Sequence, residues 1–155
     1  MKLSEITLDS ERQEKGAWIG DVPELEGLKL LVRGINNSDW RRLQAKLIDT
    51  VPRKKRMSGR MDPDEADRIQ STCLLNACLL DWDGLEEDDG KPIPFSKELA
   101  RKLLFEPEYR KFRDGVIWAA TVVAEQTNED QKEILGNLPK LSDGTSNGEL
   151  KSSTG

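Results

Sequence analysis

Residues 62–81, DPDEADRIQSTCLLNACLLD, carry both the start signal and the apolar stripe of a helix. Asp62 can cap the first turn, Pro63 suits the first helical position, and Glu65 stands three residues after the cap. The apolar positions that follow recur every three or four residues: Ala66, Ile69, Cys73, Ala77 and Leu80, widened by Leu74 and Cys78. Because the segment becomes apolar on most sides toward its end, it predicts a central helix over residues 63–81.

The segment well before this helix predicts a small β-hairpin. Residues 17–19 and 28–32 are short apolar runs, and Gly20, Asp21 and Pro23 between them favour a turn. Residues 1–16 are polar and have little periodicity. We therefore expect a flexible N-terminal segment followed by two paired strands.

Another amphipathic helix is predicted between the hairpin and the central helix. Asn37 or Ser38 can accept hydrogen bonds from the free amides of its first turn, and Pro52 ends it. Its apolar stripe consists of Trp40, Leu43, Leu47 and Val51. The opposite face is charged, so one side of this helix should pack inward.

Two further helices are predicted after residue 95. Ser96 can cap residues 97–104, and Pro107 disfavours helical geometry at Glu106 while opening a helix that runs to about residue 126. A last short helix is expected from the cap Asn128 to Gly136. From Pro139 onward the chain is rich in Ser, Gly, Thr and Asn, which is typical of disorder.

These elements predict a mainly α fold of the α+β type, with about five helices and a small N-terminal β-hairpin. The length of 155 residues suits one domain. We place that domain at residues 17–138, between the flexible segment 1–16 and a disordered tail at 139–155.

Composition argues against several functional classes. The longest uncharged apolar run, residues 73–80, is far shorter than the roughly 20 residues that span a bilayer, and residues 1–15 lack the apolar centre of a secretory signal. A cytoplasmic location is therefore expected. Cys73 and Cys78 have neither redox nor zinc spacing, so we interpret both as buried hydrophobes. The absence of histidine removes the commonest general base and metal ligand.

The acidic loop DWDGLEEDDGKPIPFS, residues 81–96, contains six carboxylates. It fails the calcium-loop pattern in both registers: counting from Asp81 places Leu85 at position 5, and counting from Asp83 places Leu85 at position 3. A catalytic pair would need two acids held in a cleft, whereas these lie on an exposed turn. We predict instead a tight turn at Asp89 and Gly90 that brings Leu85 beside Ile93. No metal site, cofactor or catalytic residue is therefore expected, and the protein should not be an enzyme.

The loop PRKKRMSGR, residues 52–60, contains five cations and no acid. It can be a solvated linker, a nucleic-acid patch, or one half of a contact between subunits. The net charge of −5 weighs against nucleic acid. If the basic and acidic loops lie on opposite sides, subunits could associate head to tail into a ring or filament. The residues proposed for self-association are Arg53, Lys54, Lys55, Arg56, Glu86, Glu87, Asp88 and Asp89.

The segment CLLDWDGLEEDDGKPIPFSKELARKLL, residues 78–104, resembles the tail assembly chaperones of long-tailed (siphovirus, lambdoid-type) bacteriophages. That family shows a tryptophan turn, an acidic stretch ending in Asp-Gly, a Pro-x-Pro-Phe entry and a leucine-rich helix. The corresponding residues here are Trp82, Gly84, Asp88, Asp89, Gly90, Pro92, Pro94, Phe95, Leu99, Leu103 and Leu104. Residues 24–47 resemble the family's β segment and first helix, so the likeness covers residues 17–125.

The resemblance implies a non-catalytic chaperone that acts in the infected host's cytoplasm and is absent from the finished virion. It would bind the tape measure protein, keep it soluble and help to recruit the major tail tube protein, as a homo-oligomer that is sometimes joined by a frameshifted longer form of itself. A chaperone for an apolar helix needs grooves between its own helices. The aromatic residues proposed to line such a groove, if they are not simply core, are Trp40, Trp82, Phe95 and Trp118.

Overall fold

A computed structural model of the chain describes residues 1–126, apart from the side chains of residues 57–59. The chain divides into two compact units. Residues 10–124 form one unit, which contains the sheet and nearly all of the helices. Residues 1–9 belong to the other unit and contain the short 3₁₀-helix η1, Leu3–Glu5.

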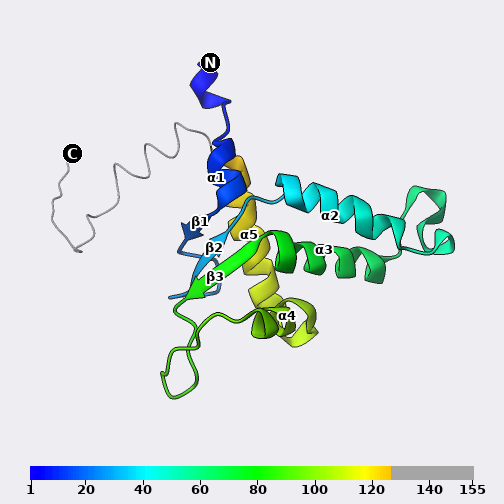
Figure 1. The fold of residues 1–155 in the computed structure, drawn as a ribbon. Helices are drawn as coiled ribbons and strands as arrows, with labels where there is room; N and C mark the ends of the chain where they lie inside the picture. Colours follow the sequence, from blue (N-terminus) through cyan, green and yellow to red (C-terminus); the bar gives the residue numbers. More distant parts are fainter. Residues whose placement is uncertain (127–155) are drawn as a thin grey trace. The chain divides into compact units, whose positions relative to one another are not determined.

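A three-stranded antiparallel sheet forms in the order β1-β2-β3 (Figure 1). The predicted hairpin is present as β1, Ala17–Ile19, and β2, Lys29–Val32, with Trp18 opposite Leu31. The third strand of the sheet, β3, spans Leu79–Asp83 and places Trp82 opposite Leu30. Both of these side chains are buried beneath one face of the sheet.

The prediction of a helix to residue 81 is therefore wrong at its end. Helix α3, Pro63–Ala77, stops four residues earlier, and the chain turns at Cys78 into β3. An apolar run such as CLLNACLL suits a buried strand as well as a buried helix, so periodicity alone does not separate them. The strand forms because its backbone pairs with β2, from Leu79 opposite Val32 to Asp83 opposite Lys29. Just beyond these strands, the Arg33 amide donates to the Cys78 carbonyl at 2.9 Å.

The other helices follow the predicted signals closely. Asn37 caps α2, Ser38–Asp49, and Asp62 caps α3, so both capping predictions are confirmed. Ser96 caps α4, Lys97–Phe105, through the amide of Leu99. Helix α4 ends before Glu106, whose backbone is extended, and the chain continues through η3, Pro107–Tyr109, into α5, Arg110–Glu125. The helix expected at 128–136 and the tail at 139–155 lie outside the described residues.

Helix α1, Ser10–Lys15, occupies a stretch that was expected to be flexible. Its six residues bury nothing completely, so no apolar stripe marked it in the sequence. It is held by polar contacts to residues more than 20 positions away: Gln13 donates to the Ile35 carbonyl, and Glu14 accepts from Ser38. Such contacts are non-local and leave no local pattern.

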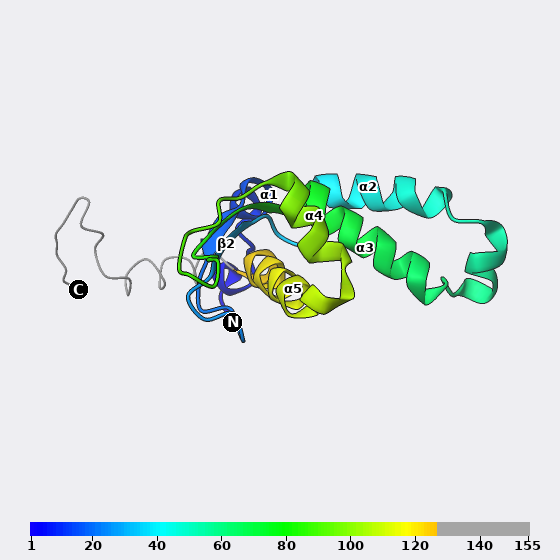
Figure 2. The same cartoon turned by 90° about the horizontal axis from the view of Figure 1, so that it is seen from below.

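The core of residues 10–124 lies between the sheet, α3, α4 and α5, and α2 packs along α3 (Figure 2). Leu74, Leu104 and Val116 are among its fully buried side chains. Trp82 stacks edge-on against both Phe95, at 4.9 Å between ring centroids, and Phe112, at 5.8 Å. The mainly α fold with a small β part is thus confirmed.

Candidate functional site

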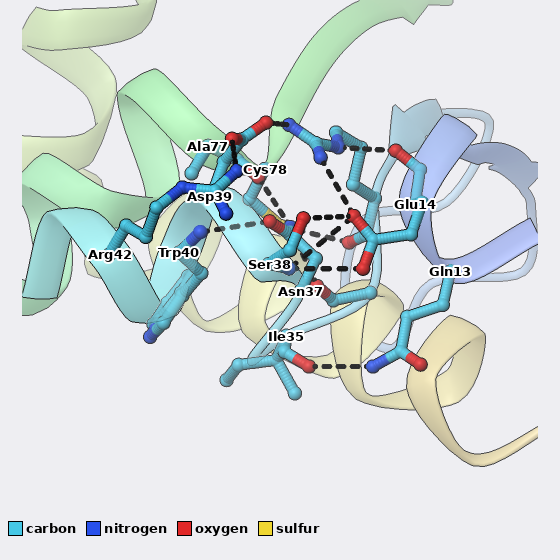
Figure 3. Close-up of polar contacts among 12 residues, drawn as sticks. Gln13, Glu14, Ile35, Asn37, Ser38, Asp39, Trp40, Arg42, Ala77 and Cys78 are labelled. Atoms are coloured by element: carbon cyan, nitrogen blue, oxygen red, sulfur yellow. Dashed lines mark hydrogen bonds and ion pairs between the residues drawn. The ribbon is translucent and has the colours of Figure 1, made fainter. Parts of the chain in front are cut away.

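A polar junction fixes the start of α2 against the rest of the fold (Figure 3). The buried Asn37 side chain accepts from the Trp40 amide at 2.9 Å. Its amide nitrogen donates to the carbonyls of Gly34, at 2.9 Å, and Ala77, at 2.6 Å. One side chain therefore caps α2 and joins it to the end of α3.

Charged groups extend this junction to α1. The Glu14 carboxylate accepts from both the amide and the hydroxyl of Ser38, and Arg33 lies between Glu14 and Asp39. Hydrogen bonding from the Ser38 hydroxyl is the main cause of a lowered pKa at Glu14, which burial partly opposes. Asp39 also has a lowered pKa, chiefly because Arg42 and then Arg33 donate to it. These interactions orient α2 against α1 and the end of α3.

A groove between α2 and α3, hereafter the hairpin groove, lies beside this junction. Its volume is about 430 Å³. On α2, Trp40, Gln44 and Ile48 face it at a spacing of four residues, which places them on one side of the helix. The remaining lining residues are Ile35, Asn36, Met61, Ala66, Asp67, Ile69 and Gln70. The lining combines apolar side chains with amide groups and the carboxylate of Asp67, a composition suited to a polypeptide partner.

Trp40 combines burial with an unsatisfied donor. Its side chain is 3% exposed, and its indole Nε1 is buried with no hydrogen-bond acceptor among the described residues. In Figure 3 the indole points away from the Asn37 and Glu14 contacts. Leaving such a donor unpaired costs about 1–3 kcal/mol. Because Nε1 is enclosed by the fold, a partner in the groove does not reach this donor without a rearrangement of the side chain.

The basic loop forms the connection between α2 and α3 and contains the 3₁₀-helix η2, Arg53–Gly59. Arg53, Lys54, Lys55, Arg56 and Arg60 are all exposed. Lys55 lies 3.5 Å from Glu65, whereas the other four have no ion-pair partner within residues 1–126. Four cations are therefore available at the end of the hairpin groove that Ile48 and Met61 line.

The acidic loop forms the small hairpin that the sequence predicted. The Ile93 amide donates to the Leu85 carbonyl at 2.8 Å, and Gly90 adopts a positive φ of 91° in the turn. Glu86, Glu87, Asp88 and Asp89 are exposed, and only Asp89 has an ion-pair partner in the described part of the chain, Lys91 at 4.0 Å. Within residues 1–126, no three His, Cys, Asp or Glu side chains are grouped closely enough to hold a metal ion.

The four aromatic residues proposed for partner binding do not share one surface. Trp40 borders the hairpin groove, whereas Trp82 is 4% exposed and packs in the core with the partly buried Phe95. Trp118 is 38% exposed and borders a separate hollow of about 220 Å³ beside Pro23 and Lys111. The sequence did not identify Gln44, Ile48, Met61 and Ala66 as groove residues, although the spacing of Trp40, Gln44 and Ile48 was a usable signal.

Both cysteines are buried thiols. Burial raises the pKa of Cys73 to about 11 and that of Cys78 to about 12. The Cys78 thiol donates to the Arg33 carbonyl at 3.0 Å. At neutral pH they are protonated and act as packing groups. No helix among residues 1–126 has the length and hydropathy needed to span a membrane.

Comparison with known proteins finds a family match. Residues 35–137, more than half of the chain, match the family described as YdaY prophage protein. The matched region begins at Ile35 and so contains α2, α3 and the hairpin groove between them. Searches of curated proteins and of solved structures find no match.

Proposed function

Because the chain belongs to the YdaY prophage protein family, we propose that it is a phage morphogenesis protein of the tail assembly chaperone type. In this proposal it binds the tape measure protein, keeps it soluble and helps to recruit the major tail tube protein. It acts by binding, without catalysis, in the host cytoplasm, and it leaves before the virion is complete.

The hairpin groove is the observation that supports this proposal most directly. An open hollow of about 430 Å³ lies between two amphipathic helices, and Trp40, Ile48 and Met61 border it. Grooves of this kind accept the apolar face of a helix from another protein. A tape measure protein offers many such faces along a long helical rod, which would otherwise associate with one another.

Self-association is the second part of the proposal. Within residues 10–124, the basic loop lies at the end of the α2–α3 hairpin remote from the sheet, and the acidic loop follows β3 (Figures 1 and 2). Opposite charges at separated ends favour head-to-tail contacts, which close into a ring or extend as a filament. Several linked copies would bind a long partner with increased avidity.

Oligomer mass measured across a salt series tests the second part. Light scattering at 20 mM and 500 mM salt should show assemblies that dissociate as salt screens the charges. Neutralising Glu86, Glu87, Asp88 and Asp89 should give monomers at both concentrations. A wild-type protein that is monomeric at low salt would refute the head-to-tail arrangement.

Co-expression tests the chaperone function itself. The protein and the tape measure protein of the same prophage are produced together, and the soluble fraction of the tape measure protein is measured. We expect that fraction to rise several-fold and the two proteins to co-purify. A tape measure protein that stays insoluble, or that is equally soluble alone, would contradict the proposal.

A nucleic-acid adaptor is the alternative function, favoured by the four unpaired cations of the basic loop. It predicts a salt-dependent complex with DNA or RNA that disappears when Arg53, Lys54, Lys55 and Arg56 are replaced by glutamine. The chaperone proposal predicts no such complex at 150 mM salt. The net charge of −5 favours the chaperone.

A further inference from the structure

The two ends of the hairpin groove differ in charge, and the proposed function does not depend on this difference. Its wall is uncharged along α2, where Trp40, Gln44 and Ile48 line it. The end at Ile48 and Met61 leads directly into the basic loop, because Pro52 and Arg53 follow the last turn of α2 and Arg60 precedes Met61. A partner in this groove would therefore meet apolar and amide groups along most of its length, the Asp67 carboxylate, which lies 3.6 Å from Arg113, and positive charge at one end.

We propose that the hairpin groove binds a short amphipathic helix with acidic residues at one end, and that this end lies against the basic loop. The inference deepens the proposed function, on which it rests, by specifying the chemistry and direction of the bound segment. From Trp40 to Ile48 the groove wall rises about 12 Å along α2, at 1.5 Å per residue. This length accommodates about two turns of a partner helix, with apolar side chains three and four residues apart.

Charge complementarity selects the acidic end. Arg53, Lys54, Arg56 and Arg60 are exposed and lack ion-pair partners within residues 1–126, so they can face a ligand without breaking an existing contact. Lys55 is already paired with Glu65. Acidic side chains in the first turn of a helix also interact favourably with its dipole. The bound helix should therefore direct an acidic N-terminal turn toward the basic loop.

The amide group of Gln70 adds specificity to the groove. Gln70 accepts a hydrogen bond from Arg113 through its Oε1, which leaves its amide nitrogen able to donate. The Trp40 indole Nε1 is buried and is not presented to the groove, so Trp40 contributes apolar surface to this wall. The Gln70 amide favours a partner helix whose apolar stripe contains one side chain with a hydrogen-bond acceptor, such as Ser, Asn or Gln.

Two exposed alanines provide a matched pair of variants. Ala66 lies on α3 and borders the groove, whereas Ala45 lies on α2 outside the groove lining. Alanine and arginine have similar helix propensities, so Ala66→Arg and Ala45→Arg should fold equally well. Only the arginine at position 66 places a long side chain into the groove. Circular dichroism and urea unfolding of both variants check that the fold is intact.

The probes are two fluorescein-labelled, 18-residue amphipathic peptides with the same apolar stripe. One has four glutamates in its first turn and the other four lysines at the same positions. Anisotropy should show that the glutamate peptide binds at least tenfold more tightly at 50 mM salt. Ala66→Arg should weaken it at least tenfold, and Ala45→Arg less than twofold. Replacing Arg53, Lys54 and Arg56 by glutamine should abolish the preference between the peptides.

Three outcomes would overturn the inference. The first is equal binding of both peptides, and the second is unchanged binding of the glutamate peptide by Ala66→Arg. The third is that a single-stranded oligonucleotide displaces the glutamate peptide and that the glutamine variant no longer binds the oligonucleotide. The last outcome would assign the basic loop to nucleic acid. Co-expression separates this inference from the proposed function. If the wild type and Ala66→Arg solubilise the tape measure protein equally, the chaperone function stands and the groove is not its site. If neither protein solubilises the tape measure protein while the peptide results hold, the groove binds a different helical partner.

Discussion

Replacing Asn37 by alanine should destabilise the fold more than any other single polar substitution at the start of α2. The side chain is 1% exposed and makes three hydrogen bonds. Loss of the cap on the Trp40 amide costs about 1 kcal/mol. Loss of the donor to the Ala77 carbonyl leaves a buried acceptor unpaired, which costs about 2 kcal/mol. The Gly34 carbonyl still accepts a hydrogen bond from the Asn37 backbone amide at 3.2 Å, so losing the side-chain donor to it adds little to the destabilisation.

The expected loss is therefore about 3 kcal/mol in the free energy of unfolding, or a fall in Tm of roughly 10 °C for a domain of this size. Asn37→Ser separates the two contributions. Its hydroxyl can still cap α2 but does not reach Ala77, so it should lose about 2 kcal/mol. Urea unfolding followed by circular dichroism measures both variants, with an unchanged m-value as evidence that the comparison is valid.

Asn76→Ala is the matched control. Asn76 is exposed on α3 and donates only to the Thr72 carbonyl within its own helix, so its replacement should change stability by less than about 0.5 kcal/mol. A loss below 1 kcal/mol for Asn37→Ala would refute the reasoning. Equal losses for the serine and alanine variants would show that the cap contributes nothing.

Three further predictions follow from single contacts. Gly84→Ala should lower the free energy of unfolding, measured in urea, by about 3 kcal/mol, because φ is 95° and a Cβ would overlap the Gly27 carbonyl oxygen. Gly90→Ala should lower it by about 1 kcal/mol, because φ is 91° but no neighbour lies within 4 Å. Similar losses for the two variants would exclude the overlap as the cause. The lowered pKa of Glu14 stabilises the fold above pH 4.5, and this contribution is lost as the pH falls through the folded-state pKa. The Tm of the wild type should therefore decline more steeply below pH 4.5 than that of Glu14→Gln. Parallel declines would contradict the assignment of this effect to Glu14. Cys78, with a pKa of about 12, should resist iodoacetamide at pH 8 until the protein unfolds, and rapid labelling of the native protein would show that the thiol is accessible.

The candidate site was only partly visible in the sequence. The apolar stripe of α2, the two caps and the charge of the basic loop could all be read there, because each depends on residues within a few positions of one another. The residues that α3 contributes to the hairpin groove were not identified, because the direction in which Ala66 and Gln70 face depends on how α2 packs. Trp82 illustrates the same limit: the sequence made it a candidate for partner binding, and packing against Phe95 and Phe112 places it in the core.

The amino-acid sequence by itself determined helices α2, α4 and α5, the start of α3, the caps of α2, α3 and α4, the β1–β2 hairpin and the turn at Gly90, since hydrogen bonds and φ preferences within one segment specify them. Only the tertiary structure decided that residues 79–83 form a strand and residues 10–15 a helix. The first depends on the free edge of β2, nearly 50 positions earlier, and the second on Arg33 and Ser38, about 20 positions later. Non-local hydrogen bonds decided both, because they satisfy backbone and carboxylate groups that no nearby residue can reach.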